Sequence, residues 1–427
     1  MQYQNSLEFA RQMDQTDPLR RFRDRFVFPQ HKGRNVAYFT GNSLGLQPKD
    51  AKQAVEEVLT DWGQLAVEGH FYADRPWFDF HKLFKKNAAS LAGCEEEEVV
   101  LMNALTVNLH FLMVSFYRPQ GKRFKILCEE KAFPSDQYVL ESQVKFHGYD
   151  PQEAIVEVGP RPGEHLIREE DVLQKIDELG DTLALVMMGG VNYYTGQLFD
   201  MQRITAHAQS QGALVGWDLA HAYGNVELKL AEWNVDFAAW CTYKYLNSGP
   251  GACSGVFVNK RYADDRSLPR FAGWWGYDQA TRFKMEKGFV PMHGADGWQV
   301  SNGPILGKAA HRVALDLFAE AGFDNCQKKR DLLTGYLEFV LDEISAESTR
   351  VKFEIITPRD KTKRGSQLSV LVHGQGRELF THLMENGVVV DWREPGVIRM
   401  APVPLYNSFE DIYIAGQHIR EKCVDHS

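Results

Sequence analysis

Two short polar segments of the chain combine residue types that can support covalent chemistry. The first holds Asp218 and, three residues later, His221, and the second holds the adjacent pair Tyr243 and Lys244. A carboxylate in a dry pocket can keep a pyridine nitrogen protonated, while a lysine amine condenses with an aldehyde. The alternative is that Asp218 caps a turn and Lys244 lies on the surface. Either motif taken alone favours this alternative.

Both segments directly follow a short apolar run, residues 213–215 and 237–240. Runs of this length, bounded by turn residues, predict strands that are buried on both faces of a parallel sheet. The residues that follow then lie at the carboxyl ends of neighbouring strands, where open α/β sheets bind ligands. Asp218 and Lys244 are therefore expected at one edge of the sheet, as the two groups that pyridoxal phosphate requires.

A further predicted strand, residues 124–128, is followed by Phe133, Ser135 and Asp136. An aromatic ring and an acid at a strand end can stack on a flat ring and hydrogen-bond to it. Ser135 and Asp136 are explained equally well as the capped start of a helix, so the segment alone does not decide between these two interpretations.

A helix is expected to open near residues 103–108, with Thr106 at its N-cap. The free N–H groups behind such a cap form a ready anion site that suits a phosphate. Many helices begin with threonine and bind no ligand, so this segment is only suggestive of a phosphate site.

Several residues could contact a substrate. Arg399 follows a predicted strand and could hold a carboxylate with two hydrogen bonds, although a single arginine is more often part of a surface ion pair. The turn at residues 41–45 contains two glycines around Asn42 and Ser43, which let a ligand or a partner chain approach the backbone. An exposed tryptophan such as Trp274 in a loop often marks a ligand or subunit contact.

Apolar spacing predicts helices and strands beyond this region. The expected helices are 51–65, 305–321 (ended by Gly322), 324–344, 378–386 and one after Ser408, and the expected strands are 99–102, 183–188, 256–258, 368–372, 388–390 and 397–400. This order indicates an α/β protein with a large, mostly parallel-sheet domain and a smaller α+β domain. We expect an N-terminal arm at 1–34, the large domain at 35–304 and the small domain at 305–427.

The composition of the 427 residues is that of an ordinary globular protein, with 44% hydrophobic and 25% charged residues. The net charge of −9 argues against nucleic acid or an anionic membrane as the main partner. The N-terminus has no pattern of a secretory signal, and no apolar run is long enough for a membrane span. Six scattered cysteines without a Cys-x-x-Cys motif predict a reduced, cytoplasmic protein. Because the sequence has no cluster of His and Cys residues, we expect no metal site.

Five longer motifs together resemble one family. The motifs are Tyr38–Lys49, Phe133–Asp136, Asp218–Ala222, Tyr243–Lys244 and Ala401–Phe409. They are similar to those of kynureninase, a pyridoxal phosphate enzyme with the aspartate aminotransferase fold (fold type I). The resemblance extends from about Tyr38 to the C-terminal helix and so covers most of the chain.

The resemblance implies a role for each matching residue. Lys244 forms the Schiff base with the cofactor, Asp218 holds the ring nitrogen protonated, and Tyr243 is expected to move protons. The implied cofactor contacts are Leu105, Thr106, Phe133, Asp136, Asp218, His221, Tyr243, Lys244, Trp274 and Asn302, with Trp274 coming from the second subunit of a homodimer. In some relatives a serine stands where this chain has Gly189, so a side-chain contact is absent there.

The implied reaction is hydrolysis of the Cβ–Cγ bond of L-kynurenine or 3-hydroxy-L-kynurenine, which yields an anthranilate and L-alanine. It belongs to tryptophan degradation and NAD biosynthesis. The implied substrate contacts are Ser43, His70, Tyr194, Ser301, Asn302 and Arg399. Within this set His70, Ser301 and Asn302 match relatives that prefer the 3-hydroxy substrate, and a polar site that bonds a hydroxyl rejects the analogue without it.

Other functions of the same fold remain as alternatives. A transaminase could share every cofactor residue. A cysteine desulfurase needs an exposed reactive cysteine, and neither Cys326, in an amphipathic helix, nor Cys253, beside a glycine run, is well placed. A non-catalytic cofactor sensor usually carries a fused binding domain, for which this chain has no spare segment.

Overall fold

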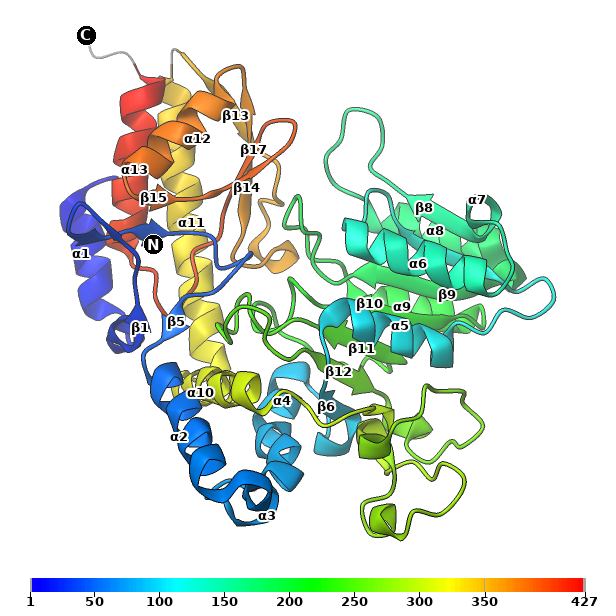
Figure 1. The fold of residues 1–427 in the computed structure, drawn as a ribbon. Coiled ribbons are helices and arrows are strands. Elements are labelled where there is room, and N and C mark those ends of the chain that lie inside the picture. The colour runs from blue at the N-terminus through cyan, green and yellow to red at the C-terminus, as the bar shows by residue number, and fades with distance from the viewer. Residues whose placement is uncertain (1, 349, 425–427) are drawn as a thin grey trace.

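A seven-stranded sheet forms the centre of the larger part of the chain (Figure 1). The computed structural model describes residues 2–348 and 350–424. The strand order is β6 (Val99–Leu101), β12 (Gly255–Val258), β11 (Phe237–Trp240), β10 (Leu214–Asp218), β9 (Leu183–Gly189), β7 (Lys125–Glu129) and β8 (Ile155–Val158). Strand β12 is antiparallel to both of its neighbours, whereas β11, β10, β9, β7 and β8 are mutually parallel. The predicted mostly parallel sheet is confirmed.

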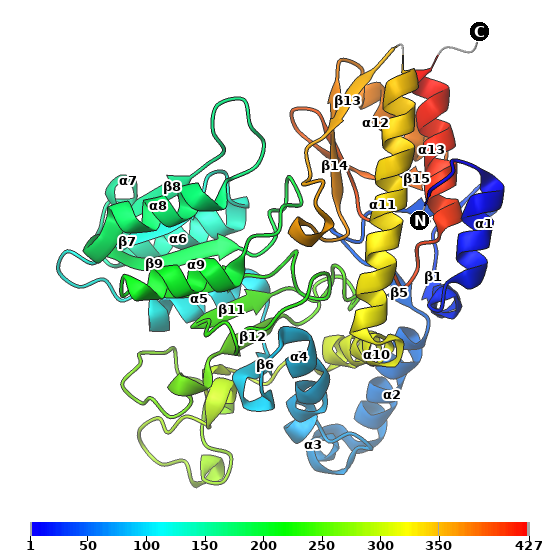
Figure 2. The same cartoon turned by 180° about the vertical axis from the view of Figure 1, so that it is seen from behind.

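Helices cover both faces of this sheet, which explains why its strands read as continuous apolar runs. On one face, α5 (Leu105–Phe116) and α6 (Pro134–Phe146) pack against residues such as Leu185 and Met187. On the other face, α4 (Lys85–Ala92), α8 (Glu169–Leu179) and α9 (Met201–Ser210) pack against Val186 and Met188. Figures 1 and 2 show the two sets of helices from opposite sides.

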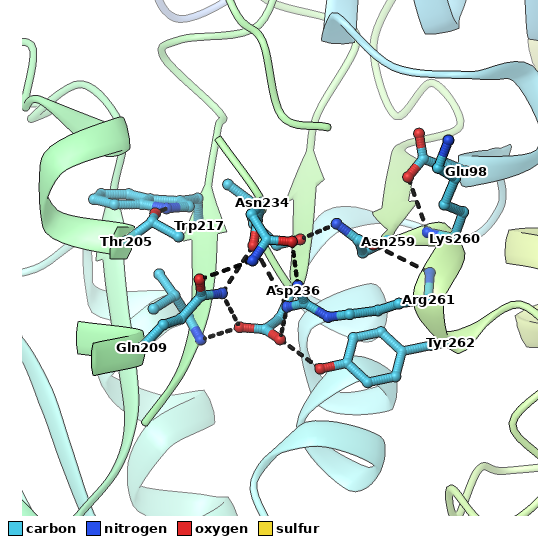
Figure 3. A network of polar contacts seen from close by, with 12 residues as sticks. Glu98, Thr205, Gln209, Trp217, Asn234, Asp236, Asn259, Lys260, Arg261 and Tyr262 are labelled. Atoms are coloured by element: carbon cyan, nitrogen blue, oxygen red, sulfur yellow. Dashed lines mark hydrogen bonds and ion pairs between the residues drawn. The ribbon is translucent and has the colours of Figure 1, made fainter. Parts of the chain in front are cut away.

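A buried carboxylate joins four parts of the sheet domain, namely α9, β10, β11 and the segment after β12 (Figure 3). Asp236 immediately precedes β11 and is completely buried. Its carboxylate accepts hydrogen bonds from the backbone N–H of Val215 (2.7 Å) and from Gln209, and it is paired with Arg261 and Tyr262. These contacts hold the amino end of β11 in place relative to β10.

A second, antiparallel sheet forms the centre of the smaller part: β13 (Lys352–Ile355), β14 (Leu368–His373), β17 (Val397–Met400) and β16 (Asp391–Arg393). It shares a core with α11 (Phe323–Glu347), α12 (Gly376–Glu385) and α13 (Phe409–Cys423). The N-terminal residues join the same core, because α1 (Leu7–Thr16) packs on α13 and β4 (Ala37–Tyr38) pairs with β15 (Val388–Val389). The division of the chain near Pro304 stays a prediction.

The remaining elements are short or lie at the junction of the two parts. Helix α2 (Asp50–Leu65) packs on α10 (Ile305–Ala321), and α3 (Gly69–Tyr72) and a 3-10 segment, η3 (Trp77–Phe84), follow α2. The other bounds are β1 Phe26–Val27, β2 Gln30–His31, β3 Arg34–Asn35, β5 Gln47–Pro48 and α7 Pro151–Ala154. None of the helices in the described residues has the length and apolarity needed to cross a membrane.

Several predicted element ends are confirmed. Gly322 ends α10 with a positive φ of 74°, which suits glycine, and Ser408 with Asp411 forms the expected capping box of α13. The prediction that Thr106 caps its helix is wrong. Helix α5 begins at Leu105, with Ala104 at the N-cap and Thr106 as the second helical residue. Asn103, with a φ of 47°, turns the chain into the helix earlier than the position of the threonine suggested.

Candidate active site

A cavity of about 420 Å³ opens at the carboxyl ends of β9, β10 and β11, where the sheet faces the smaller antiparallel sheet. Its lining includes many of the residues predicted from the sequence: Ser43, Leu105, Thr106, Phe133, Asp136, Asp218, His221, Tyr243, Lys244 and Arg399. Strand β10 ends at Asp218, and Lys244 lies four residues beyond the end of β11. The adjacency of these parallel strands is what brings the acid and the lysine together.

The lysine amine is held by a neutral histidine. Lys244 Nζ lies 2.9 Å from His221 Nε2. Burial and the positive charges of Lys244, Arg399 and Arg393 all lower the pKa of His221 well below its usual value. The imidazole is therefore neutral, so its Nε2 accepts the hydrogen bond and the ammonium of Lys244 donates it. His221 thus fixes the position of the amine within the cavity.

Three buried carboxyls also line the cavity: Asp218, Asp136 and Glu129. Burial, the charge of Asp218 and a hydrogen bond to it raise the pKa of Asp136 well above its usual value. Burial also raises the pKa of Asp218, while the hydrogen bond from Asp136, the N–H of Ala220 (2.7 Å) and the charge of Lys244 act in the opposite direction. Asp136 therefore keeps its proton and donates a hydrogen bond to the carboxylate of Asp218.

The start of α5 offers an anion site at the same cavity. Its N-cap residue, Ala104, has no side-chain oxygen to accept from the first N–H groups of the helix. Leu105 and Thr106, in the first turn, both line the cavity. Unsatisfied N–H groups and the positive end of a helix favour a phosphate at this position. The ring of Phe133, which is half exposed, lies on the cavity wall where it could cover a flat ring.

Two arginines from the smaller sheet complete the cavity wall. Arg399, on β17, is buried, and its guanidinium donates to the carbonyl of Tyr193 (2.7 Å) and pairs with Asp391. Arg393, on β16, donates to the same carboxylate over 3.2 Å. Asp391 thereby orients both guanidinium groups. The arrangement leaves positive charge facing the cavity, as expected for a site that takes a carboxylate.

Tyr243 lies next to Lys244 and on the cavity wall. Burial, together with Cys241 and the negative charge of Asp218, raises the pKa of Tyr243. The phenol therefore stays protonated near neutral pH and can donate a hydrogen bond to a substrate oxygen.

Among the described residues, five predicted site residues lie outside this cavity. Tyr194 is adjacent to the cavity residue Tyr193, but its carbonyl points to Gln367 and Ser369. The others are His70 on α3, Trp274 at the start of a short 3-10 helix (Trp274–Gly276), and Ser301 and Asn302 in a loop. His70 bonds the carbonyl of Val67 (3.1 Å) through Nδ1.

The cavity also contains residues to which the sequence assigned no role, notably Asn42, Glu129, Tyr193 and Arg393. Glu129 is the last residue of β7, one position beyond the predicted strand end, and Arg393 lies six residues before Arg399. The position of Glu129 beside a strand end was visible in the sequence, whereas the strand β16 that ends at Arg393 was not predicted. Their approach to Asp218 and Lys244 depends on the order of the strands and on the packing of the two sheets.

Comparison with known proteins identifies the family. The family model described as the kynureninase C-terminal domain matches residues 327–419. The curated kynureninases of Flavobacterium psychrophilum and Christiangramia forsetii are 59% and 57% identical to this chain, over 425 and 421 residues. The alignments cover 100% and 99% of both chains. The chain belongs to the kynureninase family.

Solved structures share the fold of this kynureninase family member at much lower identity. A cysteine desulfurase from Thermococcus onnurineus has a TM-score of 0.73 at 17% identity and covers 99% of both chains. An alanine–glyoxylate aminotransferase from Nostoc has a TM-score of 0.67 at 16% identity, covering 93% of this chain and 98% of its own. At this level the likeness concerns the fold alone, and it confirms the predicted fold type I architecture.

The cofactor of the kynureninase family is pyridoxal phosphate, and the cavity fits it. Asp218 is an ionised carboxylate for the ring nitrogen, Lys244 is an amine for the aldehyde, and the uncapped start of α5 suits the phosphate. His221 Nδ1 is buried with no partner among the described residues, so it remains available as a donor to a bound group. We conclude that this chain uses pyridoxal phosphate.

Proposed function

We propose that this protein hydrolyses the Cβ–Cγ bond of L-kynurenine and 3-hydroxy-L-kynurenine, releasing an anthranilate and L-alanine. The observation that carries the proposal is the joint position of Lys244 and Arg399 in one cavity. An amine that can exchange with a substrate amine, next to a buried guanidinium for a carboxylate, suits an α-amino acid. Full-length similarity to curated kynureninases narrows the amino acid to an aryl ketone.

The residues of the cavity would bind the substrate and move protons during the reaction. Pyridoxal phosphate, when bound, supplies an aldehyde that accepts the amine and an electron-withdrawing ring. Arg399 holds the substrate carboxylate, and Lys244, once free, takes the proton from Cα. Water adds to the γ-carbonyl, the Cβ–Cγ bond breaks, and Cβ takes a proton. The phenol of Tyr243, which precedes Lys244 in the chain and lines the same cavity, would serve the proton transfers at the diol and at Cβ.

We further propose a homodimer in which each cavity is completed by the second subunit. His70, Trp274, Ser301 and Asn302 lie outside the cavity of their own chain, yet the resemblance assigns them to the site. Apolar side chains are exposed around two of them: Trp62 (60%), Val67 and Tyr72 (73%) near His70, and Phe283 and Met285 beyond Trp274. Aromatic contacts join both regions, since Phe78 packs on Phe71 and on Phe283. A large exposed apolar surface of this kind is typical of a subunit interface.

In that dimer, His70, Ser301 and Asn302 would contact the aromatic end of the substrate and favour 3-hydroxykynurenine. We expect the changes His70→Trp and Asn302→Thr together to shift preference towards kynurenine. The proposed setting is tryptophan degradation or NAD biosynthesis in the cytoplasm. A desulfurase is less well supported, because Cys253 and Cys326 are buried.

The test is a side-by-side assay of purified protein with both ketones and with an amino donor and a keto acid. Release of 3-hydroxyanthranilate and alanine, faster than release of anthranilate, would support the whole proposal. Equal or reversed rates would remove the 3-hydroxy preference and keep the reaction. Amino transfer without cleavage of either ketone would replace the proposal with the transaminase function.

A further inference from the structure

A third carboxyl of the cavity, Glu129, has no role in the proposed reaction. It ends β7, is 3% exposed, and accepts the N–H of Gly189 with both oxygens at 3.1 and 3.2 Å. A Cβ atom at position 189 would lie 3.0 Å from Glu129 Oε1. Because Gly189 has no side chain, the carboxyl of Glu129 can occupy this part of the cavity wall beside β9.

Glu129 lies close to Asp218, because Gly189, whose N–H it binds, is the register partner of Asp218 on β10. The charged groups that act most strongly on it are Asp218 on β10 and Glu157 on β8. Glu129 in turn acts on Asp136 of α6, which shares a proton with Asp218. Lys244, after β11, is the cation that faces the Asp136 and Asp218 pair, and in the reaction its amine is used for covalent bonding.

We propose that Glu129 is a positioning residue for the ring nitrogen of pyridoxal phosphate and acts through the Asp136–Asp218 pair. When Glu129 is ionised, its negative charge holds the shared proton on Asp136. Asp218 is then a full carboxylate and accepts the N–H of the cofactor ring. When Glu129 is protonated, the ring nitrogen loses the support of that charge. The proposal rests on the cofactor of the family and is independent of which ketone is the substrate.

The charge of Glu129 changes near neutral pH. Burial, with the charges of Asp218 and Glu157, raises the pKa of Glu129 to about 7, although its hydrogen bonds with backbone N–H groups favour the ionised form. The protonated cofactor ring adds a nearby positive charge, which favours ionised Glu129. Cofactor binding should therefore release a proton from Glu129 near pH 7, and Glu129 should strengthen binding as the pH rises through this value.

The experiment measures the dissociation constant of pyridoxal phosphate for the apoenzyme between pH 6 and 8.5, by equilibrium dialysis. The wild type is compared with Glu129→Gln and with a control, Glu153→Gln. Glu153 is an exposed acid of α7 that lies outside the cavity. The cofactor's own titration affects the wild type and both variants equally. The dissociation constant of each variant divided by that of the wild type therefore isolates the effect of the replaced acid.

We expect the dissociation constant of Glu129→Gln, divided by that of the wild type, to be near 1 at pH 6 and to rise to about 10 at pH 8. A tenfold ratio corresponds to a shift of about one unit in the pKa of Glu129 on cofactor binding. Glu153→Gln should follow the wild type. A ratio that does not change with pH, or the same change in Glu153→Gln, would overturn the proposal. If Glu129→Gln does not fold, proton release is measured during cofactor binding to the wild type by calorimetry in two buffers. Release beyond that of the free cofactor near pH 7 supports the proposal, and its absence overturns it.

Discussion

At the scale of single residues, the site depends on side chains whose protonation is set by their neighbours. Asp136 keeps a proton so that Asp218 can stay ionised, and His221 is neutral so that it can accept from Lys244. The residue types and their positions beside strand ends were predictable from the sequence. Their protonation states were not, because burial and partner charges arise only when the chain is folded.

Replacing the lysine of the site should abolish turnover without unfolding the protein. We expect Lys244→Ala to lower kcat by about 10³-fold or more, because the amine both binds the cofactor covalently and moves the Cα proton. The measurement is product release under saturating cofactor, with thermal unfolding as the control. Retention of more than about a tenth of the activity would exclude the assigned role of Lys244.

The guanidinium of Arg399 should not be replaceable by an amine. Arg399→Lys cannot donate to the Tyr193 carbonyl, pair with Asp391 and bind a carboxylate with two bonds at once. We expect a rise in KM of about tenfold or more, with a smaller change in kcat. The matched control is Arg266→Lys on the surface, which should leave both constants unchanged.

At the scale of elements, buried polar groups hold the strands and helices that carry the site. Asp236 anchors β11, from whose far end Lys244 follows, and His81 of η3 lies in a buried region with Asp296, Lys85 and Lys308. The sequence shows neither network, since its members come from segments far apart in the chain.

Removing the carboxylate of Asp236 should destabilise the sheet. Asp236→Ala leaves the Val215 N–H and the guanidinium of Arg261 without their buried acceptor. We expect a loss of about 3 kcal/mol in the free energy of unfolding, as is usual when one partner of a buried charged pair is removed. Denaturant unfolding measures the loss, and the exposed Glu232→Ala serves as the control. A change below about 1 kcal/mol would contradict this role.

The stability of the protein should fall in mild acid because of His81. Burial lowers the pKa of His81 to about 4, below the value of about 6.5 in an unfolded chain. The unfolded state therefore takes up the proton first, so the contribution of His81 is complete above pH 6.5 and is lost as the pH falls towards 4. Neither ring nitrogen has a hydrogen-bond partner within the described part of the chain, so His81→Leu leaves no new orphan group.

The test compares the free energy of unfolding of His81→Leu with that of the wild type at several pH values. Between pH 7 and pH 5 the wild type should lose about 2 kcal/mol of stability more than His81→Leu does. The exposed His373→Gln should behave as the wild type. Parallel stability curves for His81→Leu and the wild type would show that His81 does not titrate in this way.

At the scale of the whole molecule, one chain holds a cavity with most of the predicted cofactor residues but not the predicted contacts for the aromatic end. His70, Trp274 and Asn302 lie outside it, and the exposed aromatic residues near His70 and Trp274 provide the surface for the proposed second subunit.

Trp274→Ala should therefore weaken cofactor retention even though Trp274 does not line the cavity of its own chain. We expect the dissociation constant of pyridoxal phosphate to rise about fivefold or more, because exposed tryptophans at interfaces contribute strongly to binding. The control is Phe146→Ala, which removes another exposed aromatic residue from α6. Unchanged cofactor affinity in Trp274→Ala would count against a shared site.

The sequence by itself determined the fold class, the cofactor and the family. Strands at 214–218 and 237–240 were recognisable because both of their faces are buried, and turn and cap residues such as Gly322 and Ser408 act through local geometry. Local rules failed at Thr106, where the turn at Asn103 starts the helix earlier.

The tertiary structure decided which strand ends are neighbours, and so which groups share the cavity. Glu129 and Asp391 became part of the site because β7 lies beside β9 and because β16 pairs with β17. Such contacts join residues distant along the chain. Their effects on proton affinity follow from burial and from the distance between charges, which a linear sequence does not contain.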